Sequence, residues 1–175
     1  MNLLRALRLL RDQSSLDLGL VLTGSDKGNL DHVLQEIETA GISDRVFVAG
    51  FVPRDDLTAL YRASTALVFP SYFGPDNIPP LEAFALGCPV VAANVAGAVE
   101  QIGEGALLFD PSSPSDIAAK IESLCRMPSL REKLIAKGAE IAKRRTPQAF
   151  LETLCTSLDR FEAFRRCWGG TYHQL

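Results

Sequence analysis

Short apolar runs alternate along the chain with longer segments in which apolar residues recur every three or four positions. The apolar runs end at glycine, proline or polar residues, which is typical of buried strands. They cover residues 16–23, 45–49, 66–69, 89–92 and 106–109. The periodic segments predict helices over residues 2–13, 30–40, 55–63, 81–86, 99–102, 115–126, 130–144 and 147–166. This alternation predicts an α/β fold, a Rossmann-like, doubly wound parallel sheet with helices on both faces and right-handed crossovers.

The stretch from Phe69 to Glu82, FPSYFGPDNIPPLE, interrupts this pattern. It follows an apolar strand, and its prolines together with Gly74 fit neither a strand nor a helix interior. A short helix follows and stops at Gly87. In open parallel sheets, ligands bind at loops of this kind, at the carboxyl ends of strands. Free backbone N–H groups and the helix dipole there favour an anion, most often a phosphate.

The helix after this loop is expected to begin beside Asn77, a good N-cap residue. Ile78 and Pro79 then lie in the first turn, where a proline costs little because its N–H would have no helical partner. We expect free N–H donors at Ile78, Leu81 and Glu82. The carboxylate of Glu82 would lie near the positive end of the helix. It could accept hydrogen bonds from sugar hydroxyls or simply cap the helix, and the spacing favours neither role.

Two other loops are expected along the same edge of the sheet. Gly50, Phe51 and Val52 follow the second predicted strand, and an aromatic ring or the backbone there can pack against a flat base. The loop at 94–98 contains Gly97, which has no side chain to block the approach of a phosphate. Alternatively, both glycines merely end their strands.

Composition and charge exclude several classes of protein. The 175 residues are 47% hydrophobic, which suits one domain with a core, and the net charge of −3 disfavours a nucleic-acid partner. No apolar run reaches the ~18 residues of a membrane span, and the first residues do not resemble a signal peptide. The four cysteines lack a C-x-x-C pair, which disfavours disulfides or zinc and favours a reducing, cytoplasmic environment.

Two common nucleotide-binding motifs are also absent from the sequence. No G-x-G-x-x-G follows a strand and no P-loop occurs, which disfavours a dinucleotide cofactor and an NTPase. His32 and His173 lie far apart and are expected at the surface. We therefore expect neither a cofactor nor a metal ion.

Taken together, these residues resemble the C-terminal, nucleotide-sugar-binding domain of retaining glycosyltransferases with the two-lobe GT-B fold, of the group 1 or family 4 type. The resemblance runs from about residue 3 to residue 146. It is carried by GFVPRDDLTALYRAS, ALVFPS and IPPLEAFALGCPVVAANVAGAVEQ, which contains the pattern P-x-L-E-A-x-A-x-G-x-P-V-V-A. It implies a donor-binding domain over 1–146 and a C-terminal helix and tail over 147–175. That helix could pack back onto the sheet or cross to the other lobe.

The resemblance implies transfer of a hexosyl group from a UDP- or GDP-sugar, with retention of anomeric configuration and without a metal ion, in polysaccharide biosynthesis. By position, Glu82 resembles the ribose-binding glutamate of the family, and Leu81 resembles a backbone donor to phosphate. The remaining matches are to the base-holding positions, at Phe51 and Val52, and to the donor-sugar positions, at Asn77 and Ile78.

Two departures from the family pattern affect these expectations. The family usually carries a glutamate eight residues before Glu82 that contacts the donor sugar, and this position is Gly74 here. Asp76 could substitute for it or could only cap the turn. The family's first strand, its diphosphate-clamping Arg and Lys loop and its N-terminal acceptor lobe have no counterpart before Met1. The chain is therefore expected to be a fragment, a split subunit or a truncated product, with the lobe acting in cis or in trans and providing any peripheral contact with a membrane.

Three functions stay open. The first is the donor-binding domain of a glycosyltransferase, inactive alone and active with its N-terminal lobe. The second is a non-catalytic nucleotide-sugar-binding module or an inactive truncated transferase, somewhat favoured by Gly74 and by the absent clamp. The third is a related enzyme such as a nucleotide-sugar epimerase, which needs acid and base groups, and only Asp76, Glu82 and Glu100 are near.

Overall fold

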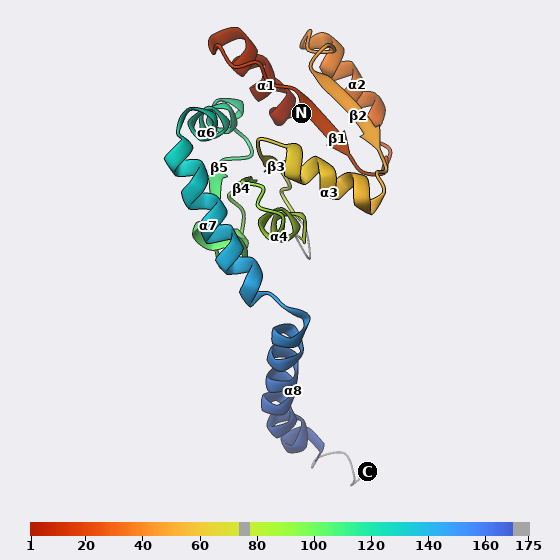
Figure 1. Cartoon of the computed structure of the whole chain (residues 1–175). Coiled ribbons are helices and arrows are strands. Elements are labelled where there is room, and N and C mark those ends of the chain that lie inside the picture. Colours follow the sequence, from red (N-terminus) through yellow and green to blue (C-terminus); the bar gives the residue numbers. More distant parts are fainter. Residues whose placement is uncertain (74–77, 170–175) are drawn as a thin grey trace.

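The computed structural model describes residues 1–73 and 78–169. Strands and helices alternate along the described chain up to the last three helices (Figure 1). The strands are β1 (Leu20–Thr23), β2 (Val46–Gly50), β3 (Leu67–Phe69), β4 (Val90–Ala93) and β5 (Ala106–Phe109). The helices are α1 (Asn2–Gln13), α2 (Leu30–Thr39), α3 (Arg54–Ala63), α4 (Ile78–Ala85), α5 (Ala98–Ile102), α6 (Pro114–Arg126), α7 (Pro128–Arg144) and α8 (Pro147–Gly169), and a short 3-10 turn covers Gly103–Gly105.

Each predicted strand and helix is present, and most bounds agree to within two residues. The largest difference is at the first strand, which was expected from residue 16 and begins at Leu20. The N–H of Leu16 donates instead to the Ser14 hydroxyl at 3.3 Å, so this segment satisfies a backbone group locally. The ladder starts where the N–H of Leu20 donates to the carbonyl of Arg45 at 2.8 Å.

The strands form two parallel sheets where one was expected. In the first sheet β1 pairs with β2, with Leu20 opposite Val46 and an irregularity between Leu22 and Thr23. In the second sheet β4 lies between β3 and β5, and Val90 is opposite both Leu67 and Ala106. Among the described residues no strand hydrogen-bonds β1 to β3, which is why the sheet is divided.

Helix α1 packs against both sheets. Its Ala6 and Leu10 belong to the core of the three-stranded sheet and α6. Its Leu4 and Leu7 are buried with α2 and the inner face of β1 and β2. Figure 1 shows α1 between α6 on one side and α2 on the other. Helix α1 therefore contacts the cores of both sheets, through Ala6 and Leu10 on one side and Leu4 and Leu7 on the other.

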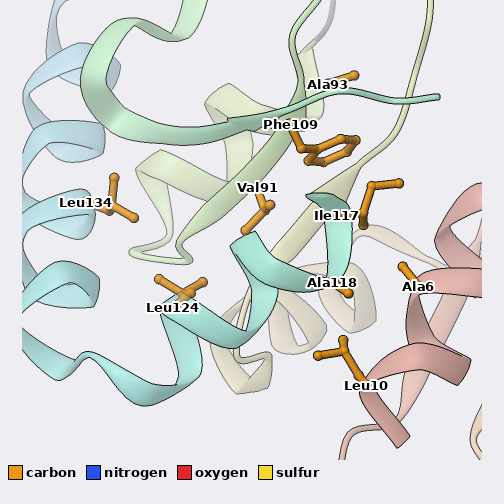
Figure 2. Packing of buried hydrophobic residues seen from close by; sticks show 9 residues of the cluster. All are labelled: Ala6, Leu10, Val91, Ala93, Phe109, Ile117, Ala118, Leu124 and Leu134. Atoms are coloured by element: carbon orange, nitrogen blue, oxygen red, sulfur yellow. The ribbon is translucent and has the colours of Figure 1, made fainter. Parts of the chain in front are cut away.

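Both faces of β4 are covered, which explains its uninterrupted apolar sequence. Val91 and Ala93 point to the face that carries α1, α6 and the start of α7, and Figure 2 shows them with Phe109 and Leu124. The alternate residues Val90 and Ala92 face Tyr61, Ala83, Phe84 and Ile102 on α3, α4 and α5. This arrangement fixes α3 and α4 side by side on one face of the sheet.

Helix α8 extends away from the rest of the chain (Figure 1). Its apolar side chains are exposed, from 42% at Leu154 to 67% at Phe150, and none of its described residues is buried. The helix itself was predicted correctly, but it does not pack back onto the sheet. No helix in the described part of the chain is long and apolar enough to cross a membrane.

Candidate functional site

The chain leaves the carboxyl end of β3 at Phe69 and enters α4 at Ile78, as the sequence predicted. Pro79 and Pro80 lie in the first turn of α4, where they cost no helical hydrogen bond. An α-helix leaves its first four N–H groups without intrahelical partners, and two of these four positions are prolines. In other helices of the chain the N–H of the fourth residue already donates to the carbonyl before the helix, as Leu57 does to Pro53 at 2.9 Å. The first turn of α4 therefore offers the N–H group of Ile78 to a ligand, and the donor role of Leu81 stays a prediction.

Three of the predicted site residues, Gly74, Asp76 and Asn77, lie outside the described residues. The predicted N-cap and the predicted contacts to the donor sugar stay predictions for this reason.

Glu82 is the fifth residue of α4, and this corrects part of the expectation. The helix dipole acts mainly within the first turn, which contains no acidic residue. The N–H of Glu82 also falls within the regular hydrogen-bonded ladder and is not a free donor. The role of Glu82 therefore rests on its exposed carboxylate, since the cap interpretation has little support at this position.

The carboxylate of Glu82 accepts a hydrogen bond from Tyr61, whose hydroxyl lies 3.3 Å from Oε2. Tyr61 is buried on α3, packed with the residues that cover one face of β4. Burial, together with the charge and the hydrogen bond of Glu82, raises the pKa of Tyr61 to about 12. The phenol is therefore a proton donor at neutral pH.

The link between Tyr61 and Glu82 was not predicted from the sequence. A signal existed in the sequence: a tyrosine on the buried face of a helix needs a partner for its hydroxyl. The sequence could not identify the partner, because α3 and α4 are separated by a strand and a loop and their contact depends on the tertiary fold.

A pocket lies where the carboxyl ends of β3 and β4 meet the starts of α4 and α5. Its lining residues are Phe69, Ser71, Pro80, Ala92, Ala93, Val95, Ala98, Gln101 and Ile102. Two of the three predicted strand-end loops therefore converge, as expected for a parallel sheet. Leu81 and Glu82 lie on the helix beside this pocket and do not line it.

Gly97 is the residue before α5 and has a left-handed backbone, with φ of +82°. A positive φ is by itself a reason for glycine at this position, so the presence of Gly97 does not require a ligand. The space where a side chain would lie is open, with no atom within 4 Å of an added Cβ. The glycine therefore leaves room for a phosphate as well.

The third predicted loop, Gly50 to Val52, belongs to the two-stranded sheet. The carbonyl of Gly50 accepts a 2.8 Å hydrogen bond from the N–H of Gly24, and the φ of Gly50 is +66°. Phe51 is 79% exposed, and neither Phe51 nor Val52 lines the pocket. The loop therefore takes no part in this pocket, and its contact with a base stays a prediction.

Tyr72 anchors the beginning of the loop after β3. Its hydroxyl donates to the carbonyl of Pro111 at 2.7 Å, and the side-chain amide of Asn2 donates to the same carbonyl at 2.8 Å. One carbonyl thus ties the β3 loop, the start of α1 and the connection from β5 to α6. This anchor was not predicted from the sequence.

A second hollow lies at the amino end of β1, lined by residues of α1, the segment after it and Arg45. Its charged groups are matched, because Arg45 pairs with Asp17 and Asp44 and Arg11 donates to the carbonyl of Gly41. It lies at the opposite end of the strand from the loops that bind ligands in such folds. We do not regard it as the functional site.

The described residues hold no group of three His, Cys, Asp or Glu side chains that could hold a metal ion. Cys88, Cys125 and Cys155 are free thiols. Burial raises the pKa of the thiols of Cys88 and Cys125, which makes them poor nucleophiles.

Comparisons with known proteins agree on one family. The family model described as glycosyl transferases group 1 matches residues 1–141. O-antigen chain mannosyltransferase B of Escherichia coli is 34% identical over 144 residues, which are 82% of this chain and 38% of that protein. D-inositol 3-phosphate glycosyltransferase of Paenarthrobacter aurescens is 36% identical over 138 residues, which are 75% of this chain and 34% of that protein.

Among solved structures, HepE of Anabaena in complex with UDP and glucose has a TM-score of 0.75 at 26% identity. The match covers 89% of this chain and 44% of the HepE chain. The present chain therefore spans less than half the length of these three proteins.

Proposed function

Because the chain belongs to the glycosyl transferase group 1 family, we propose that it is the donor-binding domain of a retaining glycosyltransferase. The donor would be a UDP- or GDP-sugar. One observation carries the proposal: α4 follows the loop at the carboxyl end of β3, with the free N–H of Ile78 in its first turn and the exposed carboxylate of Glu82 one turn later. HepE, to which the chain is similar, has been solved with UDP and glucose.

In this proposal the diphosphate lies at the start of α4. The N–H group of Ile78 and the helix dipole stabilise the negative charge that develops on the departing nucleotide, and a phosphate contact from the N–H of Leu81 stays a prediction. Gly97, before α5, leaves space for the phosphates. Asp76 and Asn77 would orient the sugar, a role that remains a prediction.

The nucleoside would extend from the diphosphate toward α3. Glu82 accepts hydrogen bonds from the ribose hydroxyls, because an exposed carboxylate has lone pairs for two such donors. Phe51 and Val52 would hold the base, and the exposed ring of Phe51 is available for stacking.

A second lobe would complete the transferase by supplying the acceptor site and closing over the donor. Glycosyl transfer requires exclusion of water, which one open sheet edge does not provide. The lobe would be supplied in cis or in trans. The chain spans 38% of the length of the similar mannosyltransferase, which leaves room for such a lobe in a protein of that kind.

Titration calorimetry of the full chain with UDP and with GDP tests the proposal and identifies the nucleotide. We expect one nucleotide to bind weakly, and Glu82→Ala to weaken it about tenfold or more, the range for losing a hydrogen bond to a charged group. Glu132→Ala, at an exposed position on α7, is the matched control and should bind like the wild type. No heat with either nucleotide at millimolar concentration would contradict the proposal.

A non-catalytic nucleotide-sugar-binding module is the second candidate, because Gly74 stands where the family usually has a sugar-contacting glutamate. Both candidates predict binding of the nucleotide. They differ in turnover, which only the first predicts once the second lobe is present.

A further inference from the structure

Tyr61 and Glu82 form a polar link between two neighbouring helices, α3 and α4. The two partners differ in mobility. The ring of Tyr61 is 8% exposed and packs with Ala83, Phe84 and Cys88, so its position is fixed by the core. Glu82 is exposed, and an exposed glutamate samples many rotamers unless a partner holds it.

We infer that Tyr61 is a positioning residue for the donor nucleotide: its buried hydroxyl holds the carboxylate of Glu82 in the orientation that accepts the two ribose hydroxyls. This inference rests on the proposed function, since it assigns a ligand to Glu82. Tyr61 does not contact the nucleotide itself.

The hydrogen-bonding capacity of the carboxylate allows this arrangement. An ionised carboxylate has about four lone-pair sites, and the bond from Tyr61 to Oε2 uses one of them. The bond is 3.3 Å long, compared with the usual 2.5–3.0 Å for a hydroxyl donor, and it leaves the other lone-pair sites of the carboxylate open. Capacity therefore remains for the two adjacent hydroxyls of a ribose.

The hydroxyl of Tyr61 is also a dependable donor. Its pKa of about 12 keeps the proton on the phenol at any physiological pH. Phenylalanine has the same ring and would fill the same space among Ala83 and Phe84. If Tyr61 served only to pack α3 against the sheet, the hydroxyl would be dispensable for ligand binding.

Calorimetry of the full chain with two probes separates positioning from packing. The probes are UDP and its 2′,3′-dideoxy analogue, or the guanosine pair if GDP is the nucleotide that binds. We expect Tyr61→Phe to weaken binding of the normal nucleotide about two- to tenfold, from the cost of immobilising one side chain. Binding of the dideoxy analogue, which offers no ribose hydroxyls, should not change.

The Glu82→Gln background supplies the decisive comparison, because Tyr61→Phe should cause no further loss there if Tyr61 acts through Glu82. Ser123→Ala is the control, since it also removes a hydroxyl that donates a hydrogen bond, but on α6 and to the carbonyl of Ala119 at 2.8 Å. An equal loss for both probes, a loss that persists beside Glu82→Gln, or an unchanged affinity in Tyr61→Phe would overturn the inference.

A measurement without ligand distinguishes failure of this inference from failure of the proposed function. The ¹³Cζ resonance of Tyr61, assigned by its absence in Tyr61→Phe, should shift at pH 7 in Glu82→Gln and not in Glu132→Gln. If wild type binds neither nucleotide while this shift occurs, the link exists and the proposed function is wrong. If wild type binds and the resonance does not move, the positioning role is wrong and the proposed function stands.

Discussion

Tyr61 and Glu82 show how differently burial acts on two hydrogen-bonded partners. The tyrosine lies in the core and the glutamate at the surface, so the ionised form of Tyr61 is destabilised by lost hydration and then by the neighbouring carboxylate. The folded state therefore keeps the proton on Tyr61 at a pH where the unfolded chain loses it. This difference changes the stability of the chain at alkaline pH.

The first prediction is a loss of stability between pH 10 and pH 12. The pKa of Tyr61 is about 12 in the folded chain against 10.0 as its ordinary value, so in this range the folded state binds more protons than the unfolded state. The free energy of unfolding therefore falls as pH rises through the window, by up to about 2 kcal/mol for a shift of this size. Urea unfolding of wild type and Tyr61→Phe at pH 9, 10 and 11 measures it. The variant should lose less stability over this range, and parallel losses would contradict the prediction.

At the same scale, the sequence identified Ile78, Leu81 and Glu82 correctly as residues at the start of a helix. The prolines made this possible, because Pro79 and Pro80 are tolerated together only in a first turn. The free N–H assigned to Glu82 was wrong, since the helix begins early enough to include that group in its ladder. Tyr61 and Tyr72 were missed because each has a partner from a distant part of the chain.

At the scale of elements, the predicted strands and helices are confirmed. The spacing of apolar residues and the glycine, proline and polar residues that end each segment point to the same elements. The strand at 106–109 and the helix at 2–13 have the predicted bounds. The division into two sheets was not predicted, because it depends on which strands pair, and local apolar pattern contains no information about pairing. The exposed position of α8 was also not predicted, since an amphipathic pattern shows that a helix has an apolar face and not what covers it.

The contact between α4 and α7 gives a prediction about packing. A Cβ added to Gly138 on α7 would lie 2.5 Å from Cδ1 of Phe84, a distance that real contacts do not allow. Alanine improves helix propensity by up to about 1 kcal/mol, but overpacking in a core costs about 1–3 kcal/mol. With several ring atoms within 3.1 Å, we expect Gly138→Ala to destabilise the chain by about 1–2 kcal/mol in urea unfolding.

Gly19→Ala is the control for this prediction, because its added Cβ would meet only the carbonyl of Arg45 at an ordinary 3.7 Å. It should change stability by much less. A Gly138→Ala protein as stable as wild type would mean that Phe84 moves aside freely and that α4 is not held against α7 by this contact.

For helix α8 we predict, in contrast, that a change leaves the stability of the chain unaltered. None of its described residues is buried, so removing residues 147–175 takes away little of the core. We expect the truncated chain to keep the unfolding midpoint of the full chain and the same affinity for nucleotide. A midpoint lowered by more than a few degrees, measured by circular dichroism, would show that α8 packs on the α/β core in solution.

At the scale of the whole molecule, three surfaces have features that folded proteins usually cover. The outer edges of β1 and β3 have no hydrogen-bonded neighbour among the described strands. Val21 and Phe47 are exposed on one face of the two-stranded sheet, and α8 carries its exposed apolar row. Unpaired strand edges and apolar patches favour association with other chains.

The last prediction is therefore that the chain associates with itself at high concentration. We expect light scattering after size exclusion to show a mass that rises with concentration above 19.0 kDa. Val21→Lys and Phe47→Lys place charges on the open face of the sheet, and Leu154→Glu with Leu158→Glu place them on α8, so each pair identifies the contribution of one surface. Lys133→Glu, at an exposed position on α7, controls for the change of charge and should leave association unaltered.

If wild type remains a monomer at every concentration, these surfaces are too small or too polar at their margins to drive association. If only the α8 pair restores the monomer, the open sheet does not pair with other chains, and the association depends on the row of leucine and phenylalanine side chains along that helix.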